Sequence, residues 1–402
     1  MTRKMKDSGV EWIGEIPEGW ELGRTWQAFK VNKVIAGDQA DKFPRLSLSN
    51  AGVIERDKYD GKGESPADYG TYQIIPKHQF VFNFMGLEQD AIYRRVGIAP
   101  ITGLVSAGYM EAEYSAERVD PLYGYYLFRY MENDQIFKQY GTGIRSNLNK
   151  KQFLNIPFLY PALNEQKEIA RLLDDKVKKI DDIIAETQQS IEELKKYKQA
   201  LITEVVTKGL DANVEMKDSG IEWIGTIPVS TKLRKIKTFL KVKNGKEIKE
   251  DTGEISVYGS GGAFKKTNEI IYDRASVLFG RKGTIGKPLL VKEPFWTVDT
   301  MFYTQIMETL VELKWVYYLF TVLPWEYHTT QTALPSIVGT DVENIKVPYV
   351  SLRNQKKIVD YLDKKTDQID SLIMTKQQVV FEYQKYKNMI IYEYVTGKRY
   401  IK

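Results

Sequence analysis

A glycine-rich loop at Gly280–Pro288, with the sequence GRKGTIGKP, has residue types that could hold a phosphate. A nucleotide-binding P-loop needs four residues between its first glycine and a closing Gly-Lys-Ser/Thr. Here five residues separate Gly280 from Gly286, and Pro288 stands where the Mg²⁺-binding hydroxyl should be. The spacing therefore argues against nucleotide hydrolysis at this loop.

The same loop retains three side chains suited to contact with DNA: Arg281, Lys282 and Thr284. Because glycine has no Cβ, a glycine-rich loop can bring its backbone close to a phosphate or a base edge. We therefore interpret the loop as a candidate DNA contact, with a plain surface turn as the alternative.

Two stretches in the first half of the chain have a similar composition. The segment GTGIRSN contains Arg145, Ser146 and Asn147, and the segment YRRVG contains Arg94 and Arg95. Arginine can bind guanine through two hydrogen bonds, and asparagine can bind adenine in the same way. Turn or capping roles and a solvated arginine pair are the structural alternatives.

A further stretch in the second half, VYGSGGAFKK, sets Tyr258, Ser260 and Lys265 around three glycines and is a fourth candidate contact. The sequence offers little for catalysis. It has no cysteine and only two histidines, which argues against disulfides, thiolate chemistry, cysteine-ligated zinc and a histidine-based triad or metal site. We expect no catalytic residue, no metal and no cofactor in this chain.

The segment NIPF at Asn155–Phe158 resembles the Asn/Asp-Pro-Pro-aromatic motif of adenine methyltransferases, but only weakly. Ile156 replaces the first proline, and the corresponding segment of the second half reads KVPY, without the amide. A strand end that leads into a helix is the simpler interpretation.

The segments that must position these residues occur twice in the sequence. MKDSGVEWIGEIP at Met5–Pro17 returns as MKDSGIEWIGTIP at Met216–Pro228, and the segment Asn164–Gly209 aligns without gaps with Arg353–Lys398. Each half therefore has the same order: a short phrase, a variable segment and a long charged segment. The variable segments share little sequence, so the halves have a common framework and different contents.

The long segments are predicted helices with one apolar seam. Apolar residues recur at alternating steps of three and four from Val177 to Val205, and again from Thr366 to Tyr394. Gly209 and Gly397 follow where a helix should end. The seam does not decide between parallel and antiparallel pairing, but the short connection after Gly209 favours an antiparallel pair with a two-fold relation between the halves.

The variable segments are predicted to mix strands and helices. FPRLSLSNAGVI, YQIIPKHQFVFNF, EISVYGS and ASVLFG have strand and turn patterns, and Pro121–Tyr140 and Val311–Tyr327 are aromatic-rich with helical character. The fold class is therefore α+β, with two mixed α/β domains joined by two long helices in an antiparallel coiled coil and a pseudo-two-fold internal repeat. The predicted segments are residues 1–161, 162–211, 212–350 and 351–402.

Composition sets further limits. Charged residues make up 28% of the 402 residues, the net charge is +5, and no apolar run approaches the length of a membrane helix. These values are typical of a globular protein without a membrane span, and we expect it in the cytoplasm.

The doubled phrase, the helix starts LNEQKEIARLL and LRNQKKIVDYL, and the GRKGTIG and GTGIRSNL loops together resemble the specificity subunit of type I restriction-modification systems. The resemblance spans nearly the whole chain, with two departures: Asn354 replaces the glutamate of the helix start, and VST replaces EGW after the second phrase.

The resemblance implies that each variable segment is a target recognition domain for one half of a split sequence in double-stranded DNA. It implies that the helices dock two methylation subunits, which carry S-adenosylmethionine and methylate adenine. The resemblance also implies that, where the complex cleaves DNA, two restriction subunits with ATP and Mg²⁺ join it. A tandem-domain coiled-coil scaffold that binds proteins without DNA specificity is the alternative.

Overall fold

In a computed structural model, the chain divides into two compact units. The structure describes residues 3–59, 66, 68–88, 94–143, 146–248, 251–330 and 335–401. Unit 1 contains Met1–Thr187 and Val379–Lys402, and unit 2 contains Gln188–Gln378. Each unit therefore combines one variable segment with half of each long helix.

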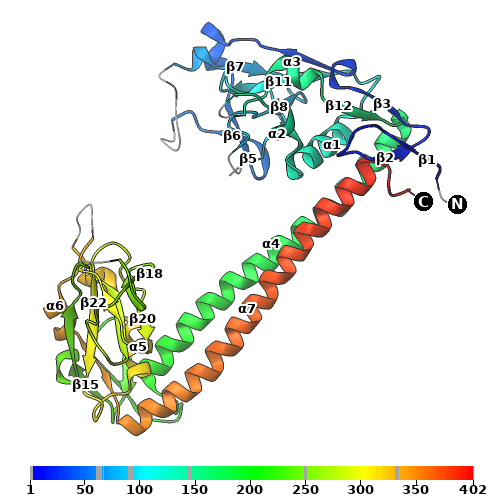
Figure 1. Cartoon of the computed structure of the whole chain (residues 1–402). Helices are drawn as coiled ribbons and strands as arrows, with labels where there is room; N and C mark the ends of the chain where they lie inside the picture. The colour runs from blue at the N-terminus through cyan, green and yellow to red at the C-terminus, as the bar shows by residue number, and fades with distance from the viewer. Residues whose placement is uncertain are drawn as a thin grey trace. The chain divides into compact units, whose positions relative to one another are not determined.

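Within the described residues of unit 1, strands form two four-stranded sheets and two strand pairs (Figure 1). One sheet has the order β4 (Phe29–Asn32), β11 (Met110–Tyr114), β8 (Phe80–Phe82), β9 (Val96–Ile98). The other has the order β6 (Gly52–Arg56), β5 (Arg45–Ser49), β10 (Gly103–Val105), β7 (Gln73–Ile75). The pairs are β1 (Met5–Asp7) with β2 (Glu15–Pro17), and β3 (Glu21–Arg24) with β12 (Pro157–Tyr160).

The described strands of unit 2 follow a similar plan, with three strands instead of four in the second sheet. One sheet has the order β16 (Leu240–Asn244), β22 (Met301–Ile306), β19 (Ser276–Gly280), β20 (Leu289–Val291), and the other β18 (Gly262–Thr267), β17 (Ile255–Gly259), β21 (Trp296–Thr297). The pairs are β13 (Met216–Asp218) with β14 (Thr226–Pro228), and β15 (Lys232–Lys235) with β23 (Lys346–Tyr349). Since β21 pairs with β17 in parallel, as β10 does with β5, the second sheets also correspond.

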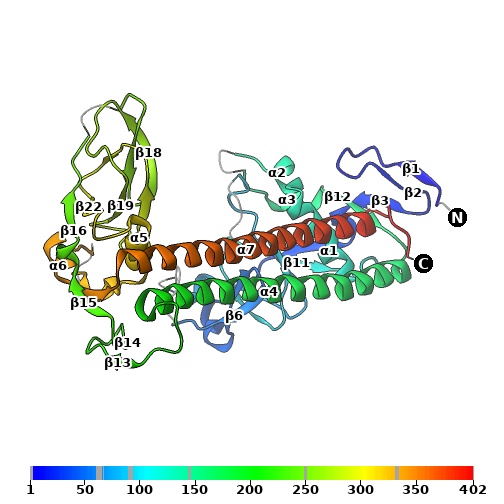
Figure 2. The ribbon, with the colours of Figure 1, turned by 90° about the horizontal axis from the view of Figure 1, so that it is seen from below.

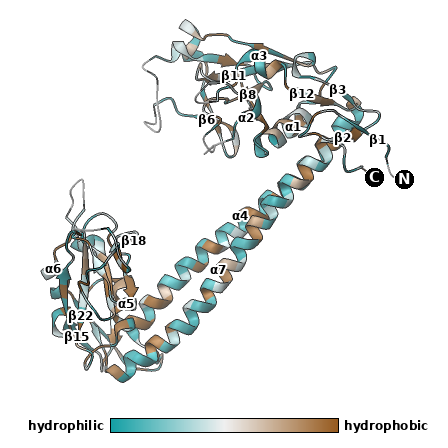
Figure 3. Cartoon of the chain, in the orientation of Figure 1, coloured by the Kyte–Doolittle hydropathy of each residue, from teal (hydrophilic) through white to brown (hydrophobic). Residues whose placement is uncertain are grey.

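The helices follow the same correspondence. Unit 1 has α1 (Pro121–Asn133), α2 (Ile136–Tyr140) and α3 (Lys150–Leu154), and unit 2 has α5 (Leu313–Val322) and α6 (Gly339–Asn344). Short 3₁₀ turns are η1 (Thr25–Gln27), η2 (Gly37–Lys42), η3 (Tyr69–Thr71), η4 (Ile236–Thr238) and η5 (Trp325–His328). The two aromatic-rich stretches form α1, α2 and α5, and their apolar side chains are largely buried. Figure 3 shows hydrophilic residues (teal) and hydrophobic residues (brown) alternating along the long helices α4 and α7.

The two long helices, α4 (Leu163–Lys208) and α7 (Leu352–Val395), pair in opposite directions. In unit 1, the first half of α4 shares a core with the last turns of α7, through Ile180 and Ile390 among others. In unit 2, the last half of α4 shares a core with the first half of α7, through Leu201 and Ile369 among others. Figures 1 and 2 show α4 in green beside α7 in orange to red. The predicted antiparallel coiled coil is therefore confirmed.

Two ion pairs display the internal symmetry of this helix pair. Lys387 Nζ lies 2.5 Å from Asp181 Oδ1, and Lys198 Nζ lies 2.6 Å from Asp370 Oδ2. The 189-residue offset of the repeat relates one ion pair to the other. Lys198 occupies one position of the otherwise apolar seam of α4, and its ion pair with Asp370 of α7 explains a charged residue there.

A buried glutamine connects each variable segment to its long helix. The Gln166 side chain accepts a hydrogen bond from the Asp120 amide and donates to the Arg118 and Pro161 carbonyls. Its counterpart Gln355 accepts from the amide of Glu312 and donates to two carbonyls, those of Leu310 and Val350. Since both glutamines are fully buried, each satisfies backbone groups that water cannot reach.

The two departures from the repeat belong together. In unit 1, the Glu165 carboxylate accepts hydrogen bonds from Trp20 Nε1 and from Arg3. In unit 2, Thr231 stands in the place of Trp20 and Asn354 in the place of Glu165. Because Thr231 has no indole N–H, residue 354 faces no such donor, and asparagine can replace the glutamate there.

The helix ends agree with the prediction, since Gly209 and Gly397 have φ of +81° and +72°. This left-handed conformation is typical of the residue that follows a helix. The α+β fold class and the duplicated framework are confirmed. The four segment boundaries remain a prediction along the sequence, because the compact units divide each long helix.

Candidate nucleic-acid interface

The glycine-rich loop of unit 2, Gly280–Pro288, forms an ordered turn at the end of β19. A Cβ on Gly280 would lie 2.1 Å from the Thr284 carbonyl oxygen, so only glycine fits there. Gly283 and Gly286 have φ of +76° and +82°, in the region that favours glycine. Lys282 and Thr284 are exposed, and Arg281 is half-buried.

Neighbouring groups hold the side chain of Arg281. Its Cζ lies 5.9 Å from the centre of the Phe302 ring, and its Nη1 lies 3.5 Å from the Asp299 carbonyl oxygen. The backbone is fixed too, because the Arg281 amide donates to the Thr300 carbonyl. A guanidinium restrained in this way loses less conformational entropy on binding than one on a mobile loop.

The segment that precedes α6 crosses over this turn. The Ile337 amide donates to the Arg281 carbonyl, and Ser336 forms a β-bridge with Lys282. The loop between α5 and α6 thus places Ser336 beside Arg281 and Lys282, although 54 residues separate Ser336 from Lys282.

Unit 1 has the same crossing at the end of β8. The Leu148 amide donates to the Phe84 carbonyl, just as Ile337 does to Arg281. The Thr142 amide donates to the Asn147 carbonyl, just as Thr330 does to Ser336. Asn147 therefore corresponds to Ser336. We call Phe84, Met85 and Asn147 in unit 1, with Arg281, Lys282 and Ser336 in unit 2, the strand-end sites.

The predicted contacts Ser146 and Asn147 differ in access. Ser146 is buried, with φ of +46°, and its carbonyl accepts from the Leu87 amide. Asn147 is exposed, and its Oδ1 accepts a 2.7 Å hydrogen bond from the Gly86 amide. The structure thus gives Ser146 a role in the turn and leaves Asn147 on the surface. The third predicted residue, Arg145, lies outside the described residues.

Arg95 supports the strand-end site from inside unit 1. It is buried, and its guanidinium donates to the carbonyls of Asn83, Met85 and Gly86. Burial lowers the pKa of Arg95, and nearby Glu132 opposes that shift. These bonds hold the loop in place, and they put the predicted DNA contact Arg95 in the interior of unit 1. Arg94 is half-buried and donates a 2.7 Å hydrogen bond to the Tyr125 hydroxyl on α1.

The other candidates of unit 2 lie on or beside the β17–β18 hairpin. Tyr258 and Ser260 are half-buried, and the exposed Lys265 has its Nζ 3.1 Å from Asp251 Oδ2. The segment between β21 and β22 connects this hairpin to the strand-end site. The Val298 amide donates to the Tyr258 carbonyl, and the Thr300 carbonyl accepts from the Arg281 amide. The hairpin and the glycine-rich turn thus share one supporting segment.

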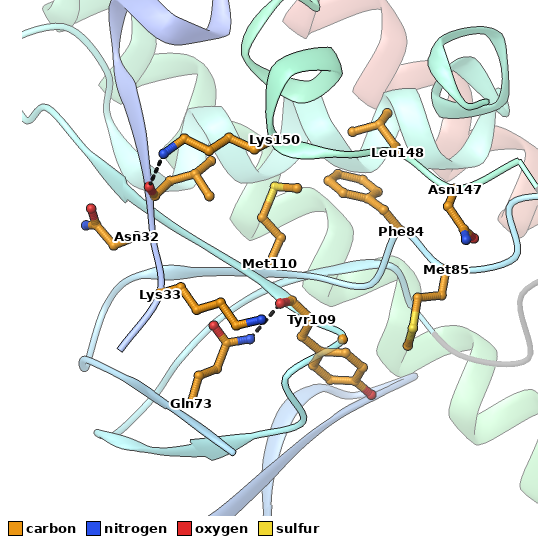
Figure 4. A pocket seen from close by; sticks show the side chains of 12 residues that line it. Asn32, Lys33, Gln73, Phe84, Met85, Tyr109, Met110, Asn147, Leu148 and Lys150 are labelled. Atoms are coloured by element: carbon orange, nitrogen blue, oxygen red, sulfur yellow. Dashed lines mark hydrogen bonds between the residues drawn. The ribbon is translucent and has the colours of Figure 1, made fainter. Parts of the chain in front are cut away.

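A pocket of about 400 Å³ adjoins the strand-end site of unit 1 (Figure 4). Phe84, Met85, Leu148 and Asn147 gather on one side, and Asn32, Lys33 and Lys150 lie on the other. Met85 is 47% exposed, whereas Phe84 and Leu148 are buried beneath it. Lys33 and Lys150 are exposed and each donates to one backbone carbonyl, which leaves their ammonium groups further N–H donors.

Beside this pocket, β11 carries a buried carboxyl group. Burial raises the pKa of Glu111 to about 7, and the nearby Glu113 carboxylate adds to the shift. The equivalent residue in unit 2 is Tyr303, because β11 and β22 pair with β4 and β16 in the same register. The two units therefore differ in charge at one position of a common sheet.

Sequence reasoning missed Phe84, Met85, Ser336 and the two lysines of the pocket. The aromatic strand VFNF, followed by an exposed methionine, was the available signal for Met85. In contrast, nothing in the sequence relates this methionine to Lys282. Asn155, from the weak methyltransferase-like motif, caps α3, and its side chain donates to the Lys151 carbonyl.

Comparison with known proteins identifies the framework. The profile of the family described as "Type I restriction modification DNA specificity domain" matches residues 92–193 and 228–380, which is more than half of the chain and falls once in each half. The chain belongs to this specificity family.

Two curated relatives come from Methanocaldococcus jannaschii. The type I restriction enzyme MjaVIII specificity subunit is 26% identical over 337 residues, covering 75% of each chain. The putative type I restriction enzyme MjaX specificity subunit is 24% identical, covering 97% of this chain and 96% of its own. The similarity to the MjaX relative thus spans nearly the full length of both chains.

Solved structures share the fold. A chain from a structure on complex assembly and conformational transition of the type I R-M system matches with a TM-score of 0.74 at 13% identity, covering 96% of this chain and 99% of that one. The HsdS subunit from Thermoanaerobacter tengcongensis matches with a TM-score of 0.51 at 14% identity, covering 98% and 100%.

The described residues contain no group of three His, Cys, Asp or Glu side chains that could hold a metal ion. Within the same residues, no helix has the length and apolarity needed to span a bilayer.

Proposed function

We propose that this chain is the non-catalytic specificity subunit of a type I restriction-modification complex that reads a bipartite, asymmetric DNA target. Each unit would read one half-site, and α4 and α7 would dock two methylation subunits. The partners would supply S-adenosylmethionine, and restriction subunits would add ATP-dependent cleavage.

One observation carries this proposal: the units repeat several hydrogen bonds of a common framework but differ in the side chains they expose. Gln166 and Gln355 make the same three hydrogen bonds, whereas Met85 and Lys282 occupy equivalent positions with unlike chemistry. Two partners of one kind can then bind a repeated framework, while two unlike readers avoid the need for a palindromic target. Membership of the specificity family supports this assignment.

The central experiment expresses the chain with the methylation subunit of its own system and sequences the methylome of the host. We expect adenine methylation at one split sequence, with none when either protein is absent. A protein-binding scaffold without DNA specificity would leave the methylome unchanged. Labelled S-adenosylmethionine supplied to the isolated chain should give no methyl transfer, and transfer would contradict a non-catalytic role.

The helix pair provides a second test, because we propose that its length sets the gap between half-sites. Asp181–Thr187 of α4 lies opposite Phe381–Lys387 of α7, as the Asp181–Lys387 ion pair shows. Deleting both heptads keeps the seam in phase and removes roughly 10 Å of helix. We expect a target gap shorter by up to about 3 base pairs, at roughly 3.4 Å per pair. If the gap between the half-sites of the sequenced target is unchanged, the length of the helix pair does not set that gap.

A further inference from the structure

The two strand-end sites stand in the same place of the framework but have opposite chemical character. In unit 1, the site has an exposed methionine over buried Phe84 and Leu148, with a carboxamide beside it. In unit 2, it has a guanidinium, an ammonium and a hydroxyl group. We propose that each strand-end site selects one base pair, that of unit 2 a guanine and that of unit 1 a thymine–adenine pair. This inference rests on the proposed function and names the residues that give each unit its preference.

Equivalence of position is the first step of the argument. The same two backbone hydrogen bonds, from Leu148 to Phe84 and from Ile337 to Arg281, hold the crossing segment against the strand end. Because these bonds involve only backbone atoms, they leave the side chains of Met85 and Lys282 free to differ without loss of the fold. A site with the same backbone in both units and different side chains is suited to give each unit a different base preference.

The chemistry of unit 2 fits guanine. Arginine bonds to guanine O6 and N7 through two parallel N–H groups, which no other base accepts in the major groove. Arg281 is restrained by the Phe302 ring and the Asp299 carbonyl, so its planar group is positioned before DNA arrives. Lys282 and Thr284 are exposed on the same turn and can contact the adjacent phosphates.

The chemistry of unit 1 fits a thymine–adenine pair. Thymine alone presents a methyl group in the major groove, and apolar side chains contact it. Met85 offers a flexible apolar surface that is 47% exposed above Phe84 and Leu148. The Gly86 amide fixes the Asn147 side chain through Oδ1, and a carbonyl oxygen keeps a second lone pair for the adenine amino group. Figure 4 shows Met85 and Asn147 on the same side of the pocket.

The lysines of unit 1 stand apart from this selection. Lys33 and Lys150 lie across the pocket from Met85 and Asn147, as Figure 4 shows. An ammonium group binds any phosphate, so these lysines add affinity without base preference. Variants of these lysines should therefore change the affinity for DNA, whereas variants of Met85 and Asn147 should change the base preference.

The test is methylome sequencing of hosts that express the full chain with its methylation subunit. Arg281→Ala should reduce discrimination at one guanine of one half-site by about 5- to 150-fold, the range that roughly 1–3 kcal/mol represents. Arg281→Lys keeps the charge and the fold but removes the two-pronged bond, so it should lose the same preference. Arg274→Ala, an exposed arginine of the same unit, is the matched control and should leave the target unchanged.

For unit 1, Met85→Ala and Asn147→Ala should relax one position of the other half-site and leave the guanine preference intact. Met307→Ala is the matched control, because Met307 is 39% exposed and follows β22 of unit 2, outside the pocket lining and off both long helices. Lys33→Ala should lower methylation of all sites in proportion and change no base preference.

The outcomes distinguish this inference from the proposed function. If the unaltered chain directs no sequence-specific methylation, the proposed function fails. If it directs methylation but the Arg281 and Met85 variants keep every base preference, the inference alone fails. A uniform loss in the Arg281 variants, with a weaker salt dependence of binding, would identify a phosphate contact and also overturn it.

Discussion

Unit 1 and unit 2 differ least where they contact the long helices and most where their strands end. Tyr126 donates to Asp174 in unit 1, and Tyr318 donates to Asp363 in unit 2, so this bond between variable segment and helix is repeated. Burial and the nearby aspartate raise the pKa of both tyrosines, which therefore stay protonated donors. At the strand-end sites the repetition stops. The comparison indicates that the interior of the framework is constrained and its outer loops are not.

Two contacting residues of the framework are replaced together between the units. Trp20 and Glu165 form a bonded pair in unit 1, and Thr231 and Asn354 replace both partners in unit 2. A half-replacement would bury an indole N–H or a carboxylate without its partner, at a cost of roughly 1–3 kcal/mol. Departures from the repeat are therefore informative when they occur in contacting pairs.

The strongest test of the common framework replaces each buried glutamine. Gln166→Leu and Gln355→Leu each remove three hydrogen bonds of a buried side chain, although in unit 2 the Leu310 carbonyl keeps its bond from the Tyr349 hydroxyl. We expect each to lower the free energy of unfolding of its own unit by about 2–4 kcal/mol. Urea unfolding, with hydrogen exchange to assign the transition, measures the effect. A loss confined to one of the two variants would break the proposed equivalence.

The next test uses the covarying pair. Glu165→Asn should destabilise unit 1 by about 1–2 kcal/mol, because Trp20 Nε1 and Arg3 lose a carboxylate. Asn354→Glu should change unit 2 by less than about 0.5 kcal/mol, since Thr231 supplies no indole donor. The same urea titrations compare the two. Equal effects would mean that the carboxylate does not act through Trp20.

The smallest expected effect concerns the buried carboxyl group of β11. Burial raises the pKa of Glu111 to about 7, above its ordinary value of 4.5, so folded unit 1 binds a proton between these pH values that the unfolded chain lacks. The stabilising contribution is therefore full below about pH 4.5 and is lost as the pH rises through 7.

Glu111→Gln should then gain stability relative to the parent as the pH rises from 5 to 6, by about 1 kcal/mol. Thermal unfolding at several pH values measures the difference. Tyr303→Phe at the equivalent position of unit 2 is the control, because burial raises the pKa of that tyrosine further from this range. A Glu111 difference that stays constant with pH would contradict the assigned cause.

Much of the framework was predictable from the sequence because its signals are local or repeated. The apolar seams predicted α4 and α7, and Gly209 and Gly397 marked their ends. The strand patterns near Arg45 and Ser276 became β5 and β19. The aromatic stretch after Pro121 is divided into α1 and α2, since Gln135 between them adopts a left-handed conformation that no local pattern indicated.

The candidate site was predictable only in part. Arg281, Lys282 and Asn147 were recognised as side chains that can bond to bases, and the structure places all three at strand-end sites. Arg95 was chosen by the same reasoning, yet it lies inside unit 1 and binds carbonyls. A sequence reports what an arginine can bond to but not whether water can reach it, since burial depends on segments far along the chain.

The sequence alone determined that this protein has one framework in two copies, because duplication and helical periodicity are properties of residue order. Only the tertiary structure decided that Met85 and Lys282 are counterparts, or that Asn147 and Ser336 are. Those relations arise from the register of sheets and from backbone hydrogen bonds between segments about 60 residues apart in the chain. Such long-range pairing is set by the packing of the whole unit, which no short stretch of residues encodes.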